Sequence, residues 1–194
     1  MVGRLLVITG ASGVGKSTLS AKIAASLEFD KIVATDTIRE TLRTQIFEEE
    51  EPALHRSSFQ PGGSGAIKDW KATVSPLNDA IQAVVSREMK RGGDILMEGV
   101  HFVPDFALID EWRATGGEAC GVVLAVEDEE EHVRMITGRR KHNGRPVRHY
   151  LDHIERIREI QDEMIKLAGK NDWLLLDLTK IEDPIGKIER YLNS

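Results

Sequence analysis

Short apolar runs recur along the chain, and a segment of helical character follows each of them. Because these runs lack polar alternation, they predict strands that are covered on both faces, as in a parallel sheet packed between helices. The pattern therefore predicts an α/β fold with a five-stranded parallel sheet and helices on both of its faces. The predicted strands cover residues 5–9, 31–35, 94–97, 121–126 and 173–178.

Between these runs, apolar residues recur every three or four positions, which is typical of the buried face of a helix. Pro76 and Pro184 suit the first turns of two of these helices, where proline is tolerated. Gly169 is expected to end the longest of them. The predicted helices cover residues 19–27, 77–89, 151–167 and 181–192.

The sequence GASGVGKS at residues 10–17 directly follows the first apolar run. It fits G-x₄-G-K-[ST] between a strand and a helix, which is the context that a phosphate-binding loop (P-loop) requires. Glycine accepts a positive φ, so the backbone can curl around phosphates, and the following helix adds its unpaired N–H groups. The expected nucleotide-binding residues are Gly10, Ala11, Ser12, Gly13, Val14, Gly15, Lys16, Ser17 and Thr18.

Three side chains of this segment have specific expected roles. Lys16 should reach the β and γ phosphate oxygens, the Ser17 hydroxyl should ligate Mg²⁺, and Thr18 should contact the α phosphate. A glycine-rich turn that merely joins a strand to a helix would explain the glycines, but not a lysine followed by two hydroxyls. We therefore predict ATP and Mg²⁺ as cofactors. The predicted fold class is a three-layer P-loop NTPase fold that resembles the nucleoside-monophosphate kinases, and this resemblance implies the strand order 2-3-1-4-5.

Composition and charge narrow the class of protein. The 194 residues are 41% hydrophobic and 30% charged, as in a globular domain, and no apolar run approaches the roughly 20 residues that a bilayer span needs. A net charge of −6 argues against nucleic acid as a partner.

The single cysteine, Cys120, excludes an intrachain disulfide and is expected to be buried. Because the first strand begins almost at once, no signal peptide is expected, and the predicted location is the cytoplasm.

Two stretches break the alternation of strands and helices. Residues 48–76, which contain PGGSG, are too long for a simple connection and are interpreted as a substrate-side insertion that is mobile or closes over a ligand. Residues 138–148, GRRKHNGRPVR, are basic and are interpreted as a lid that excludes water from phosphoryl transfer. No repeat or linker divides the chain, so we expect a single domain over residues 1–194.

The residues expected to select the acceptor follow the second predicted strand, because ligands of open α/β sheets bind at the carboxyl edge. Asp36, in TDTIRETLR, could orient an acceptor hydroxyl and take its proton, or could cap the following helix. Arg39 and Arg43 are one helical turn apart and could bind an anionic group of the acceptor. The alternative for this pair is a solvated helix face with Glu40 nearby.

Further candidates follow the third strand, in MEGVHFVP, and lie in the lid. Glu98 could hold a water on Mg²⁺ or contact the acceptor, and His101 could donate to an anionic substrate or make a structural hydrogen bond. The lid contains four arginines, Arg139, Arg140, Arg145 and Arg148. We select Arg140 as catalytic and Arg148 as substrate-binding, because a guanidinium can neutralise charge on the transferred phosphoryl group. A solvated basic loop is the alternative.

Taken together, these motifs resemble those of the archaeal 2-phosphoglycerate kinases, a group of P-loop small-molecule kinases. The resemblance covers GASGVGKSTLSAKIA, TDTIRETLR, LHRSSF at residues 54–59, MEGVHFVP, and RHYLDHIERIREIQD at residues 148–162. It implies MgATP as donor and 2-phosphoglycerate as acceptor, with the 3-hydroxyl phosphorylated to give 2,3-bisphosphoglycerate. The resemblance also implies that four residues of the insertion could donate hydrogen bonds to the acceptor, namely His55, Arg56, Ser57 and Ser58. The alternative for these residues is an ordinary loop.

Two other functions remain open from the sequence. The same chemistry could serve another acceptor, such as a nucleoside, a sugar acid, or a nucleotide-sugar like that used by zeta-toxin kinases. A nucleotide-dependent switch with slow hydrolysis belongs to a different class, although the NKXD-type guanine motif of GTPases is absent. The sequence does not indicate an oligomeric state.

Overall fold

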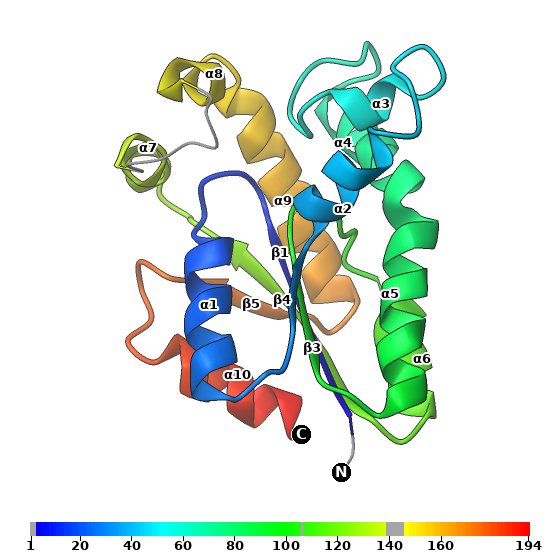
Figure 1. Cartoon of the computed structure of the whole chain (residues 1–194). Helices are drawn as coiled ribbons and strands as arrows, with labels where there is room; N and C mark the ends of the chain where they lie inside the picture. Colours follow the sequence, from blue (N-terminus) through cyan, green and yellow to red (C-terminus); the bar gives the residue numbers. More distant parts are fainter. Residues whose placement is uncertain (1–2, 106, 139–145) are drawn as a thin grey trace.

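The computed structural model describes residues 3–105, 107–138 and 146–194 (Figure 1). Its centre is a five-stranded parallel sheet with the order β2-β3-β1-β4-β5, so the predicted fold class and strand order are confirmed. Leu5 pairs with Ile95 on one side and with Ala119 on the other, which places β1 in the middle of the sheet. The strands are β1 (Arg4–Gly10), β2 (Ile32–Ala34), β3 (Ile95–Glu98), β4 (Glu118–Ala125) and β5 (Leu174–Asp177).

Helices cover both faces of the sheet, and successive residues of β1 point to opposite faces. Leu5 and Val7 belong to one apolar core, whereas Leu6 and Ile8 belong to the other. The second core is covered by α1 and α10, and the first by α4, α5, α6 and α9 (Figure 1). The helices are α1 (Lys16–Ser26), α2 (Thr35–Leu42), α3 (Pro52–His55), α4 (Ala66–Val74), a 3₁₀ turn η1 (Ser75–Leu77), α5 (Asn78–Arg91), α6 (Ala107–Ala114), α7 (Glu129–Thr137), α8 (Val147–Leu151), α9 (Ile154–Lys170) and α10 (Pro184–Leu192).

The long helix predicted over residues 151–167 is two helices. Asp152 and His153 separate α8 from α9. The prediction that Gly169 ends the helix is wrong, because α9 continues to Lys170. The preceding Ala168 is fully buried and its carbonyl accepts the N–H of Trp173, so packing carries the helix past the glycine.

Both prolines lie at helix starts. Pro184 is at the first turn of α10, where the Asp183 side chain caps the helix by accepting the N–H of Gly186. Pro76 lies in η1, the 3₁₀ turn that directly precedes α5, rather than in the first turn of α5 itself.

The insertion at residues 48–76 contains two helices, α3 and α4, that the periodicity did not reveal. Trp70 of α4 is completely buried. The Asp69 carboxylate accepts the backbone N–H groups of Gly62 and Ser64 at 2.7 and 3.0 Å, and it pairs with Arg156 of α9 at 2.7 Å. The glycine-rich turn is therefore wrapped around a buried carboxylate, and an ion pair attaches the insertion to the long helix.

Cys120 lies within β4 and is buried, as predicted. Burial raises the pKa of its thiol to about 12, so the thiol is neutral and is not a nucleophile at physiological pH. Across the described ranges, every helix is too short or too polar to span a lipid bilayer.

Candidate active site

The loop at residues 10–17 joins β1 to α1 at the carboxyl edge of the sheet. Gly13 has φ of 93°, and a Cβ there would lie 2.4 Å from Cγ1 of Ile136, so only glycine fits. Gly15, with φ of 92°, is the N-cap of α1 and has no side chain with which to cap the helix. The N–H groups of the first turn of α1 are thus left for another acceptor, which is what an anion-binding helix terminus requires.

Lys16 and Ser17 are the two side chains of the loop with the most informative contacts. The Lys16 ammonium is largely buried and donates to the carbonyl oxygens of Gly10 at 2.9 Å and Ala11 at 2.7 Å. The Ser17 hydroxyl donates to Oε1 of Glu98 at 3.0 Å. Glu98 ends β3 and is 8% exposed. The structure therefore brings the two predicted magnesium ligands together next to the loop lysine.

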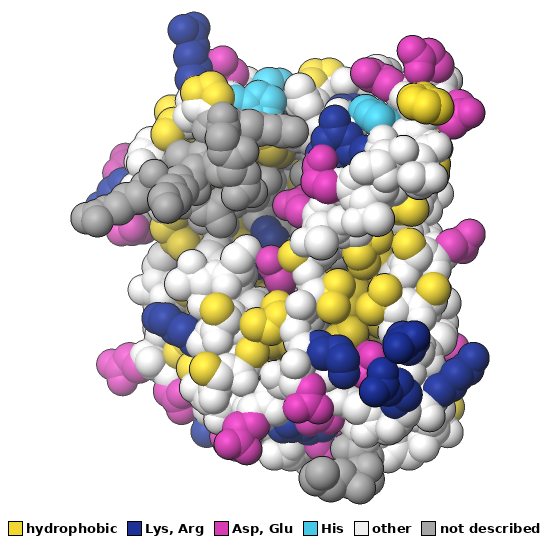
Figure 2. Space-filling view, viewed as in Figure 1, with side chains coloured by type: hydrophobic (Ala, Val, Ile, Leu, Met, Phe, Trp, Pro, Cys, Tyr) yellow, Lys and Arg dark blue, Asp and Glu magenta, His cyan; other side chains and the backbone are white. Residues whose placement is uncertain are grey.

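A cavity of about 830 Å³ lies next to Ser12 of the loop. Its volume is in the range that binds small molecules in proteins. In Figure 2, basic and acidic side chains lie next to one another in the upper part of the view, at the carboxyl edge of the sheet. The walls of the cavity come from α2, the segment after α3, and α8, and they include Asp36, Arg39, Glu40, Arg43, Ser57, Ser58 and Tyr150.

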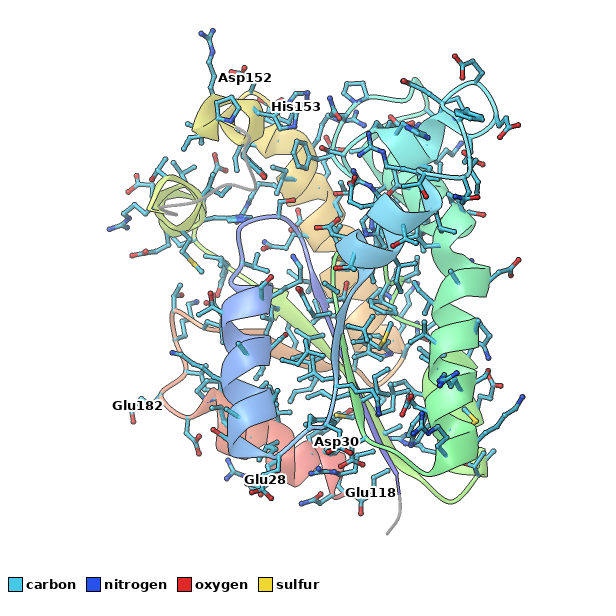
Figure 3. All side chains as sticks on the ribbon, viewed as in Figure 1. Glu28, Asp30, Glu118, Asp152, His153 and Glu182 are labelled. Carbon is cyan, nitrogen blue, oxygen red and sulfur yellow. The ribbon has the colours of Figure 1, made fainter. Side chains whose placement is uncertain are left out.

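Acidic side chains lie at both ends of the molecule (Figure 2 and Figure 3). Glu28, Asp30 and Glu118 lie at the end of the molecule near the chain termini, opposite the cavity (Figure 3). Asp152 and His153 lie at the cavity end, between α8 and α9 (Figure 3).

On α2, the predicted acceptor residues form a charged cluster. Asp36 lies in the first turn of α2 with an exposed side chain, and the N-cap is Ala34, so the helix-capping alternative for Asp36 is wrong. Arg39 is only 5% exposed, so the alternative of a solvated helix face does not hold for this arginine. Its guanidinium lies 3.7 Å from Asp36 and 3.1 Å from Glu40, and the Glu40 carboxylate also pairs with Arg43 at 2.9 Å. Glu40, which sequence reasoning treated only as a neighbour, bridges both arginines.

His101 supports this cluster from behind rather than from inside the cavity. It is 1% exposed, and its Nδ1 lies 2.9 Å from Oγ1 of Thr35 and 4.0 Å from Oδ1 of Asp36. Burial lowers the pKa of His101 to about 4; Asp36 opposes this shift and Arg39 adds to it. The imidazole is therefore neutral and buried, and the prediction that it donates directly to an anionic substrate is not supported.

This pKa predicts a pH dependence of stability. The folded His101 has a pKa of about 4 against 6.5 for the unfolded chain, so the unfolded state takes up the proton first as the pH falls. The contribution of the neutral His101 to the free energy of unfolding is fully present above about pH 6.5. It is lost as the pH falls toward 4, at about 1.4 kcal/mol per pH unit. We expect the free energy of unfolding to fall by about 2 kcal/mol more between pH 7.5 and pH 5 in the wild type than in His101→Asn. Urea unfolding at both pH values measures this, and equal losses in the two proteins would contradict it.

Arg56 and His55, two further residues predicted to contact the acceptor, bind other parts of the protein instead. The Arg56 guanidinium donates to the carbonyl of Asp69 at 3.0 Å and is not part of the cavity wall. His55 accepts from Nε of Arg43 at 3.4 Å, and its other nitrogen lies 2.8 Å from the carbonyl of Ile46, so it holds Arg43 rather than an acceptor.

The predicted lid, residues 138–148, lies only partly within the described residues. The Arg148 side chain on α8 is 87% exposed and lies 3.6 Å from Asp152. Arg139, Arg140 and Arg145 are outside the described residues.

Sequence reasoning missed the aromatic contact that closes the cavity on the α8 side. The ring of Phe59 lies 5.2–5.6 Å from the rings of His149, Tyr150 and His153. These contacts join the segment after α3 to α8 and to the turn between α8 and α9. Residues about ninety positions apart in sequence meet here, so no local pattern could have signalled the pairing.

The fold and the loop together define the class of protein: the chain has the fold of the P-loop small-molecule kinases. A shikimate kinase from Bacteroides thetaiotaomicron matches with a TM-score of 0.55 and 11% identity, over 98% of this chain and 98% of that one. A gluconokinase from Sinorhizobium meliloti matches with a TM-score of 0.52 and 17% identity, over 96% and 87%. At such identities the likeness shows the fold alone.

Sequence comparison confirms the resemblance to the archaeal 2-phosphoglycerate kinases. The chain is 31% identical over 200 residues to 2-phosphoglycerate kinase of Methanopyrus kandleri, covering 98% of this chain and 61% of that protein. It is 30% identical over 192 residues to that of Pyrococcus furiosus, covering 95% and 62%. The chain thus spans about three-fifths of the length of these relatives. No protein-family model matches it.

Proposed function

We propose that the chain is an ATP-dependent phosphotransferase that phosphorylates the 3-hydroxyl of 2-phosphoglycerate to give 2,3-bisphosphoglycerate. The observation that carries this proposal is the cavity that has Ser12 of the P-loop on one side and Asp36, Arg39 and Arg43 on the other. Such a cavity allows a donor phosphate and a small anionic acceptor to meet. The similarity to the archaeal 2-phosphoglycerate kinases supports this choice of acceptor.

The residues of the loop fit MgATP. The uncapped first turn of α1 offers N–H donors to phosphates, and Lys16 has three ammonium hydrogens to share between loop carbonyls and phosphate oxygens. Ser17 and Glu98 offer the hard oxygen ligands that Mg²⁺ prefers. Within the described ranges no cluster of three His, Cys, Asp or Glu side chains could hold a metal unaided, so the nucleotide would supply further ligands. The bound ion would neutralise charge on the phosphates.

The acceptor side supplies the other half of the chemistry. The exposed Asp36 carboxylate can orient the attacking hydroxyl and accept its proton as the new oxygen–phosphorus bond forms and the bond to ADP breaks. Arg39 and Arg43 can bind the phosphate or carboxylate of the acceptor, for which a planar guanidinium is well suited. In the structure Glu40 pairs with both arginines, so the acceptor anion would replace the Glu40 carboxylate.

An acceptor screen tests the proposal. We expect 2-phosphoglycerate to stimulate ADP release to a rate of about 1–100 s⁻¹, as in other kinases, and phosphorus NMR to identify the doubly phosphorylated product. Gluconate, 3-phosphoglycerate and adenosine are the matched acceptors to compare. A preference for adenosine would contradict the role of the arginines. ATP turnover that none of these compounds accelerates would favour a nucleotide-dependent switch.

A further inference from the structure

A histidine outside the predicted site contacts the phosphate-binding loop. His132, on α7, is completely buried, and its Nε2 lies 2.8 Å from the carbonyl oxygen of Ser12, 120 residues earlier in the chain. The same helix packs under the loop through Ile136, which occupies the space where a Cβ of Gly13 would be. Helix α7 therefore supports the loop both sterically and through one hydrogen bond.

The chemistry of this contact defines the tautomer of His132. A carbonyl oxygen only accepts, so Nε2 of His132 carries the hydrogen and donates to Ser12. Burial lowers the pKa of His132; the bond to Ser12 opposes this shift, and the positive charges of Arg158 and Lys16 add to it. Glu129 also raises the pKa. The net lowering keeps the imidazole neutral at physiological pH, which avoids placing a second cation near Lys16.

We propose that His132 is a positioning residue for the phosphate-binding loop, because it determines the orientation of the Ser12–Gly13 peptide. The structure contains no cis peptide among the described residues, and in a trans peptide the N–H points opposite to the carbonyl. Holding the Ser12 carbonyl against α7 therefore directs the N–H of Gly13 to the other side of the loop, away from α7. If that peptide turned over, a carbonyl would replace an N–H donor on that side.

The need for such a hydrogen bond follows from the residue that it constrains. Gly13 has a positive φ and no side chain, so sterics alone restrict its backbone less than that of any other residue type. An empty anion-binding loop also collects N–H dipoles of like orientation, which repel each other until a phosphate is bound. A hydrogen bond from the buried His132 side chain supplies the preorganisation that the loop sequence itself lacks. The inference rests on the proposed nucleotide binding.

Two amide variants separate this role from simple packing. In His132→Gln the side-chain nitrogen is as many bonds from Cα as Nε2 of histidine, so it can still donate to Ser12. In His132→Asn the nitrogen is one bond closer to the backbone and cannot reach. Both variants lose the imidazole ring and bury an amide, so similar losses of melting temperature are expected. Arg134→Gln, at an exposed position of α7, is the control for the helix itself.

The first measurement is hydrogen–deuterium exchange of the peptide covering residues 10–17 in the nucleotide-free protein. We expect exchange about 10-fold faster in His132→Asn than in the wild type, and within about 3-fold of the wild type in His132→Gln, since one hydrogen bond is lost or kept. The second is calorimetry with MgADP, in which the Kd of His132→Asn should be about 10-fold higher than that of the wild type. In the ADP-release assay, KM for the acceptor should not change.

The outcomes distinguish this inference from the proposed function. Wild-type protein that binds no MgADP would refute the proposed nucleotide function, while the exchange rates would still decide the role of His132. Wild-type exchange in folded His132→Asn would overturn the inference. Equal acceleration in the Gln and Asn variants would overturn it too, because packing alone would then explain the effect.

Discussion

Replacing Lys16 with methionine is expected to lower kcat/KM for ATP by about 10³-fold while the protein stays folded. The ammonium lies within 2.9 Å of two loop carbonyls, at the position from which it can reach the phosphates of a bound nucleotide. Methionine keeps a similar unbranched stem but has no charge and no donors. The loss should fall mainly on the transition state, because negative charge is redistributed over the phosphoryl oxygens during transfer.

The ADP-release assay with saturating acceptor measures this loss, and circular dichroism verifies the fold. Lys22→Met is the matched control, since Lys22 lies on an exposed position of the same helix, α1. We expect Lys22→Met to have wild-type activity. Retention of more than about one-tenth of the activity by Lys16→Met would show that the loop lysine does not stabilise the transferred group.

Replacing Asp36 with asparagine is expected to lower kcat by about 10²–10⁴-fold, with KM for ATP nearly unchanged. Asparagine has the same shape as aspartate and can still orient a hydroxyl, but it cannot take up the proton. Asp36 has an exposed side chain at the cavity, and Arg39 and the neutral His101 lie within 4.0 Å of its carboxylate. A loss below about 10-fold would mean that Asp36 only positions the acceptor.

Glu40→Gln is the control for charge. It removes one negative charge from the same helix and from the same arginine, because Glu40 and Asp36 both pair with Arg39. An effect transmitted through Arg39 would therefore reduce kcat in both variants, whereas loss of the proton acceptor reduces it only in Asp36→Asn. We expect Glu40→Gln to keep kcat and to lower KM for 2-phosphoglycerate, because it no longer competes for the arginines.

The sequence alone determined the strands, their parallel arrangement and the phosphate-binding loop. Runs without polar alternation indicate strands that are buried on both faces, as β1, β3 and β4 are, whereas the edge strands β2 and β5 are partly exposed. The proximity of Ser17 and Glu98 also followed, because the loop that leads to Ser17 begins at the end of β1, Glu98 ends the neighbouring β3, and carboxyl ends of parallel strands meet at one edge. The position of Asp36 and Arg39 beside the cavity has the same origin.

Only the tertiary structure decided which polar side chains are buried and what they contact. The pairing of Asp69 with Arg156 and the contact of His132 with Ser12 join residues 87 and 120 positions apart. The burial of His101, which makes it neutral, depends on how the segment after β3 packs against α2. Periodicity and motifs report the environment within one element, whereas desolvation and long-range hydrogen bonds arise only when elements pack together.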